Sequence, residues 1–199
     1  GVVVMSLAEA MTAHASLVEQ NLARYAAYEA NAFTALNTAF VHDGAFVHIP
    51  DGTIVEEPVH LLFLSTSNEQ GTASHPRVLL LAGVDSKATI IESYGGILDS
   101  LYFTNAVTEV VLGAGAVVRH YRLQRQSEQA FHIASTHAAL AANSSYSSFT
   151  TDMGGGLVRN NLSVLMGGEG SSCTLNGIYL VTGSQHVDNQ VIIDHAEPY

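Results

Sequence analysis

The chain has 199 residues and a formal net charge of −11, and only 13% of its residues are charged. This length is typical of one domain that buries its own core without a disulfide staple, and the single cysteine, Cys173, excludes an internal disulfide framework. Seven Lys and Arg stand against 18 Asp and Glu, so the chain lacks the clustered cations with which proteins bind nucleic acid or anionic membranes. We therefore expect no nucleic-acid or membrane partner, and a reducing, cytoplasmic location.

The first segment, residues 6–32, predicts a helix. Leu7, Met11, Val18, Leu22 and Tyr25 recur at steps of three, four and seven residues among alanines and polar residues. A capping box at its start is indicated by a serine at position 6 and a glutamate three residues later. We expect residues 1–34 to form an amphipathic helical segment that packs on a second unit, residues 35–199.

The rest of the chain predicts short strands. Turn signals at 42–44 and 50–52 flank an apolar run at 45–49. Beyond it, β-rich runs separated by small residues predict strands at 59–66, 78–81, 88–92, 102–112, 117–123, 162–166, 173–181 and 187–193.

A pattern of an apolar run, a turn residue and another strand recurs in this region. Its turn positions, Gly83, Gly113, Asn143 and Gly168, lie 30, 30 and 25 residues apart. A coiled parallel β-solenoid has a period in this range, because each coil must return above its own start. A β-sandwich, with turn signals every ~8–12 residues, is the alternative.

If the solenoid is correct, residues 40–199 supply about six coils of ~25–30 residues each. The interior should then be lined by alternate apolar residues of the predicted strands. We expect these to include Leu79, Leu81, Val110, Leu112, Val164, Met166 and Ile192.

Three segments resemble the SufB/SufD family. ALNTAFVHDGAFVHIPDGTIVEEPVHLLF, residues 35–63, is similar to the start of the family core, and VLGAGAVVRHYRLQRQ, residues 111–126, fits the region that follows. VRNNLSVLMGGEGSSCTLNGIYLVTGSQHVDNQVIIDHAEPY, residues 158–199, resembles the middle of the core and is closest to SufD. The resemblance covers roughly residues 35–199, and the first segment is similar to the helical stretch before the core.

The resemblance implies a right-handed parallel β-helix and a SufD-like, non-catalytic scaffold role in the SufB–SufC–SufD machinery. That assembly builds iron–sulfur clusters, with SufC as the ABC-type ATPase. In the family the chain continues past HAEPY with further coils and a helical C-terminal region, and its functional histidine, cysteine and glutamate and its ATPase-docking helices lie there. No catalytic, cofactor-binding or cluster residue is therefore carried over. We expect this chain alone to bind no cofactor, the cluster being handled by the assembled complex.

Histidines and carboxylates near the end of the chain suggest a metal site only weakly. Imidazole and carboxylate suit iron or zinc, and the candidates are His186, Asp188 and His195, with Asp194 beside the last. On one strand the first two share a face, whereas Asp194 and His195 point to opposite faces. We therefore interpret these residues as hydrogen-bonded corners of the solenoid.

Arg119, Arg122 and Arg125 concentrate the positive charge of the chain. We interpret them as one solvated strand face balanced by nearby acids such as Glu109 and Glu128. A contact with an anion or an acidic partner is the alternative, because guanidinium binds carboxylates and phosphates in a rigid fork.

Enzyme classes remain as alternatives to the scaffold. The alternatives are a β-helix carbohydrate-active or acyl-transfer enzyme and a metal-dependent cupin. The sequence has one plausible hexapeptide repeat, at residues 112–117, where an acyltransferase should have many, and it has no His-x-His motif. A nucleotide P-loop is excluded because no Gly-Lys-Ser/Thr occurs. We also expect self-association through the exposed end of the β-helix, at about residues 184–193, since unpaired strands add to one another.

Overall fold

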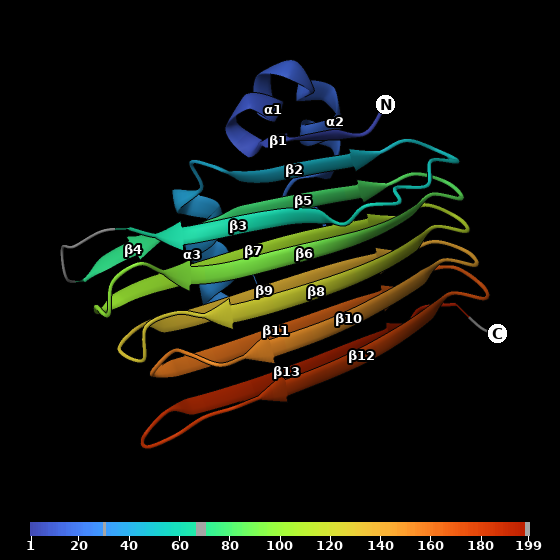
Figure 1. The fold of residues 1–199 in the computed structure, drawn as a ribbon. Coiled ribbons are helices and arrows are strands. Elements are labelled where there is room, and N and C mark those ends of the chain that lie inside the picture. The colour runs from blue at the N-terminus through green and yellow to red at the C-terminus, as the bar shows by residue number, and fades with distance from the viewer. Residues whose placement is uncertain (30, 67–70, 198–199) are drawn as a thin grey trace.

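The computed structural model describes residues 1–29, 31–66 and 71–197, which form a parallel β-helix with helices at its N-terminal end (Figure 1). Two sheets face each other across the core. Sheet A contains β2 (Gly44–Ile49), β5 (Arg77–Ala82), β7 (Tyr102–Leu112), β9 (Phe131–Leu140), β11 (Leu157–Met166) and β13 (His186–His195), with β4 (Thr72–Ser74) paired to β7. Sheet B contains β3 (Val59–Ser65), β6 (Lys87–Gly96), β8 (Val117–Arg125), β10 (Ser145–Asp152) and β12 (Ser172–Tyr179).

The chain alternates between the two sheets, and each strand pairs in parallel with the strand one turn later. The pairs β5–β7, β7–β9, β9–β11 and β11–β13 in sheet A and the four pairs in sheet B are all parallel. The predicted solenoid is confirmed, with about five turns (β13 begins a further one) where about six were expected. The alternative β-sandwich, and with it a cupin, is wrong.

One corner of each turn is set by a left-handed residue. These residues have φ between +54° and +69° and stack above one another as Gly52, Asp85, Gly115, Asn143 and Gly170. The corner backbones hydrogen-bond to one another, as in Asp85 N–H to Ala114 O at 2.8 Å. Asn143 therefore aligns with Gly115 rather than with Gly113, so the predicted spacing from Gly113 to Asn143 was off by two residues.

The apolar core lies between the sheets at the end of the turns nearest this corner. Val110, Leu112, Val164 and Met166 lie in it, as predicted. Leu79 and Leu81 do not, although both are buried.

Leu79 and Leu81 instead point to the outer side of sheet A and pack against the N-terminal helices. Every residue of β5 is buried, so an apolar run does not reveal which of its faces is the inner one. Ile192 was also predicted to be inside and is 55% exposed, because its register partner is the outward Ser163.

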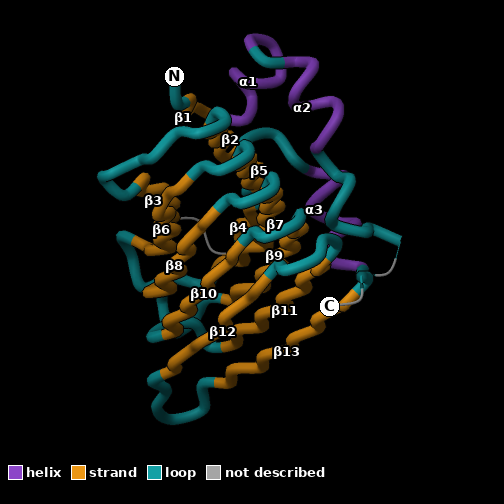
Figure 2. The backbone as a smooth tube through the Cα atoms, turned by 90° about the vertical axis from the view of Figure 1, so that its right-hand side faces the viewer, coloured by secondary structure: helices purple, strands orange, loops and turns teal. Residues whose placement is uncertain are grey.

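The N-terminal segment forms three short helices rather than one. α1 (Leu7–Ala13) and α2 (Ala15–Asn21) are separated at His14, and α3 (Ala32–Phe40) follows a turn-rich stretch. Ser6 caps α1 by accepting a hydrogen bond from the backbone N–H of Glu9 at 3.1 Å, as the capping box predicted. The helices lie along the outer side of sheet A (Figure 2).

β1 (Val3–Ser6), an additional strand that was not predicted, pairs antiparallel with β2. It adds a strand to the N-terminal edge of sheet A. The predicted boundary between residues 34 and 35 falls within α3.

Candidate functional site

The interior of the β-helix changes from apolar to polar along β6 and β8 of sheet B. In β6, inward-facing Ala88 and Ile90 are followed by Glu92 and Tyr94. In β8, Val118 is followed by inward-facing residues that are all polar: His120, Arg122 and Gln124. Because successive turns are in register, these side chains stack into one buried polar column.

Glu92 is the centre of the first part of this column. Its Oε1 lies 3.1 Å from Nε2 of His120, and the hydroxyls of Tyr94 and Thr108 donate hydrogen bonds to the carboxylate at 3.0 Å. Nδ1 of His120 lies 2.9 Å from the Tyr146 hydroxyl. Burial by itself would raise the pKa of Glu92, but the interactions with His120, Arg122 and Tyr94 outweigh it and lower the pKa.

Tyr94 and His132, whose rings contact each other in this interior, are held neutral. Burial, followed by the neighbouring carboxylate, raises the pKa of Tyr94 well above its usual value. Burial, followed by the charge of Arg122, lowers the pKa of His132 to about 3. Nδ1 of His132 lies 2.8 Å from Oε1 of Gln126, so this imidazole is a buried neutral hydrogen-bonding group.

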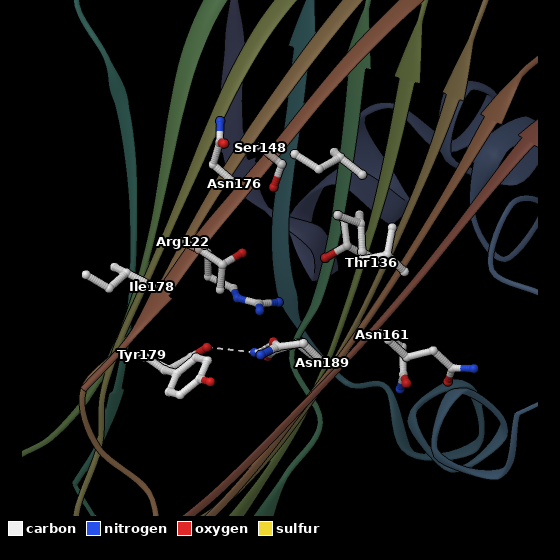
Figure 3. A pocket seen from close by; sticks show the side chains of 16 residues that line it. Arg122, Thr136, Ser148, Asn161, Asn176, Ile178, Tyr179 and Asn189 are labelled. Atoms are coloured by element: carbon white, nitrogen blue, oxygen red, sulfur yellow. Dashed lines mark hydrogen bonds between the residues drawn. The ribbon is translucent and has the colours of Figure 1, made fainter. Parts of the chain in front are cut away.

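Beyond this network the interior contains a cavity of about 260 Å³ near the last turns (Figure 3). Arg122 points into it, is 7% exposed, and has an Nε with no hydrogen-bond partner among the described residues. Asn160 donates to Oδ2 of Asp152 at 2.7 Å and to Oδ1 of Asn189 at 2.8 Å. Burial raises the pKa of Asp152, although Arg122 and Asn160 oppose the rise. The cavity therefore offers donors, acceptors and one cation to water or a small polar molecule.

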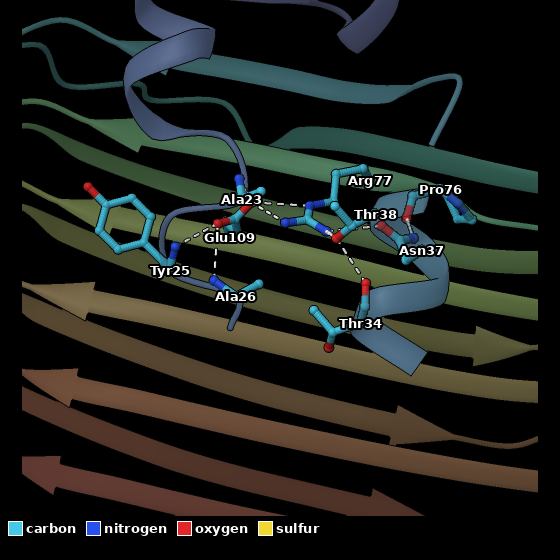
Figure 4. Close-up of polar contacts among 9 residues, drawn as sticks. All are labelled: Ala23, Tyr25, Ala26, Thr34, Asn37, Thr38, Pro76, Arg77 and Glu109. Carbon is cyan, nitrogen blue, oxygen red and sulfur yellow. Dashed lines mark hydrogen bonds and ion pairs between the residues drawn. The ribbon is translucent and has the colours of Figure 1, made fainter. Parts of the chain in front are cut away.

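A second polar cluster joins the N-terminal segment to the outer side of sheet A (Figure 4). Glu109 of β7 accepts hydrogen bonds from Nε and Nη2 of Arg77 at 3.1 and 2.6 Å, and both side chains are buried. The same carboxylate accepts from the backbone N–H groups of Ala23, Tyr25 and Ala26 at 2.8–3.1 Å.

Arg77 also reaches α3. Its Nη1 donates to Oδ1 of Asn37 at 3.1 Å and to Oγ1 of Thr38 at 3.2 Å. We call Arg77, Glu109 and Asn37 the clasp. It was missed in the sequence because two isolated charges 32 positions apart carry no motif, and Glu109 is buried here rather than balancing the Arg119 face.

The arginine cluster was predicted to form one solvated face, and this is partly wrong. Arg119 and Arg125 are exposed, whereas Arg122 and His120 point into the interior. Side chains alternate along β8, so Arg119 lies on the outer face whereas His120 and Arg122 lie on the inner face.

The weak metal candidates are spread along β13. Asp188 pairs with Arg159 at 2.8 Å, while His186 and His195 stand at the two ends of the strand. In the described part of the chain, no group of three or more His, Cys, Asp or Glu side chains is placed to hold a metal ion. No helix among residues 1–29, 31–66 and 71–197 is long and apolar enough to cross a membrane.

These features define a class of protein: a parallel β-helix with a polar interior and an N-terminal helical layer clasped to one sheet. Among known families, the SufBD core domain of SUF system FeS cluster assembly matches residues 63–199, and the SufBD protein N-terminal region matches residues 1–61. The chain belongs to the SufB/SufD family, as the sequence resemblance indicated.

Several curated relatives are similar to most of this chain. It is 34% identical over 175 residues to an iron–sulfur cluster assembly SufBD family protein, slr0076, of Synechocystis, covering 84% of this chain and 39% of that protein. The iron–sulfur cluster assembly protein SufD of Escherichia coli is 23% identical over 171 residues, covering 85% and 40%. SufB of Bacillus subtilis is 24% identical over 172 residues, covering 84% and 36%. The chain thus spans about two fifths of the length of these relatives.

Proposed function

We propose that this chain acts as a SufD-like, non-catalytic scaffold in the assembly of iron–sulfur clusters, within a complex that also contains SufB-like and SufC-like proteins. The observation that carries the proposal is the match of the two SufBD family models to residues 1–61 and 63–199, on a chain that folds as a parallel β-helix with its N-terminal layer attached. In this role the cluster is the cargo of the complex rather than a resident cofactor of this chain.

The physical basis of the scaffold role is the complementarity of its surfaces to those of partner proteins, and the 199-residue chain itself also has open strand edges. β13 and β12 are the last strands of sheets A and B in the described part of the chain, and neither has a further strand on its outer edge. Such an edge presents backbone donors and acceptors to a related chain. We propose that a second copy of this 199-residue chain pairs here, and that the scaffold role is carried out in the cytoplasm, although one relative is a chloroplastic protein.

A capture experiment tests the role. The 199-residue chain is immobilised beside a chimera in which the C-terminal part of the Synechocystis relative is appended, and purified SufB-like and SufC-like proteins are passed over both. The SufB-like protein should bind both forms and the SufC-like ATPase only the chimera, because the family resemblance assigns ATPase docking to that part. If both folded forms fail to bind either protein, the proposed role is wrong.

A further inference from the structure

The outer face of sheet B carries an exposed apolar row. Alternate residues of its strands point away from the core, and the parallel register places Ile91, Tyr121 and Phe149 beside one another on three successive turns. Tyr121 and Phe149 are 43% and 39% exposed, and their ring centroids lie 6.4 Å apart.

Further apolar residues lie on one side of this row, toward the C-terminal ends of the strands. Leu62 and Leu64 of β3 are 54% and 51% exposed, and Leu123 of β8 follows Tyr121 on the same face. The three helices lie on the outer side of sheet A instead, so no helix in the described part of the chain covers this face (Figure 2). An exposed apolar row with polar residues beside it is typical of an interaction site.

The charge on this face is opposite to that of the molecule. Lys87, Arg119 and Arg125 are exposed here, and none forms an ion pair with another described residue. The strands of sheet B contain two carboxylates, Glu92 and Asp152, and both are buried on the inner side. Three of the seven Lys and Arg thus surround an apolar row on a chain of net charge −11.

We propose that the outer face of sheet B is a docking surface for a short acidic, amphipathic segment of another protein. Apolar side chains of that segment would cover Tyr121 and Phe149, while its carboxylates reach the cations on either side of the row. This proposal does not depend on the assembly role.

Other anionic partners fit less well. An extended polyanion such as nucleic acid or an anionic membrane would also meet the acidic remainder of the chain, and three cations release few counterions. A short segment places its charges within the ~8 Å over which surface electrostatics act at physiological salt. The acidic-partner contact considered for the arginine cluster is thereby assigned to Arg119 and Arg125 and not to Arg122.

The test uses a fluorescein-labelled peptide of about 14 residues, roughly four helical turns, with Leu on one face and Glu on the other. A matched peptide replaces every Glu with Lys. Fluorescence anisotropy should show saturable binding of the acidic peptide that weakens as salt is raised, and no binding of the basic peptide. The double variant Arg119→Glu/Arg125→Glu should bind the acidic peptide about tenfold more weakly.

Two further variants separate the contributions. Tyr121→Thr/Phe149→Thr, which introduces β-branched residues that suit strands, should weaken binding at low and high salt alike. Arg24→Glu, an exposed charge reversal outside sheet B, should leave binding unchanged. The proposal would be overturned if both peptides bound equally or if the acidic peptide showed no saturable binding. It would also be overturned if Arg119→Glu/Arg125→Glu bound the acidic peptide as tightly as the parent chain, or if the parent chain bound anionic phosphatidylserine vesicles comparably.

Discussion

The clasp is expected to contribute more to stability than any exposed ion pair of this protein. In Arg77→Met, the buried carboxylate of Glu109 loses two hydrogen bonds and its counter-charge while keeping three backbone N–H donors. Removing one partner of a buried pair costs ~3–5 kcal/mol. Because the remaining donors still stabilise the carboxylate, we expect the lower end, about 3 kcal/mol.

The assay is urea denaturation followed by circular dichroism, with hydrogen exchange at residues 22–26 as a local readout. The matched control is Arg159→Met, which breaks the Arg159–Asp188 pair, whose side chains are 40% and 44% exposed. That change should cost less than ~1 kcal/mol. The double variant Arg77→Met/Glu109→Gln should cost less than the sum of the single changes, because the two residues contact each other. Equal, small losses in Arg77→Met and Arg159→Met would refute the reasoning.

Three other predictions follow from the interior, the corners and the open edge. His132 has a pKa lowered from 6.5 to about 3. Below pH ~6.5 this imidazole is therefore protonated in the unfolded chain but stays neutral in the folded chain. The free energy of unfolding should fall by up to ~1.4 kcal/mol for each pH unit of acidification. His132→Gln should make that slope shallower in denaturation measured from pH 7 to 4, and an unchanged slope would contradict the assignment. Asn143 has φ +58°, so Asn143→Ala should lower the melting temperature through ~1 kcal/mol of strain whereas Asn143→Gly should leave it nearly unchanged; equal effects would argue against the corner geometry. Light scattering should show self-association that grows with concentration and that Gln190→Lys/Ile192→Lys on β13 reduces; a monomer at every concentration in the parent chain would contradict the open-edge proposal.

Much of the fold could be predicted because β-solenoids repeat. The strand at 102–112 is confirmed to the residue, and the corners recur because a left-handed residue is needed at each turn. β9 and β10 were not predicted as strands, since their many small and polar residues lack the apolar runs typical of strands. The register at Leu79 and Leu81 failed for a different reason: β5 is covered on both sides, so both faces of its run at residues 78–81 are apolar.

The polar sites could not be predicted from spacing. Arg77 and Glu109 meet because adjacent turns are in register, and that register is a tertiary property. The same applies to Glu92 and His120, which are 28 positions apart and lie 3.1 Å apart in the folded chain. Polar residues at inward positions normally argue against a buried strand, and only their mutual hydrogen bonds make them acceptable inside the solenoid.

The most direct test of the scaffold role is an exchange of segments in a living cell. In the Synechocystis relative, the part matched by this chain is replaced by residues 1–199, and iron–sulfur enzyme activities are measured while the tagged chimera is purified with its partners. A working scaffold should restore those activities and co-purify with SufB-like and SufC-like proteins. A stably folded, well-expressed chimera that recovers neither partner nor activity would contradict the account.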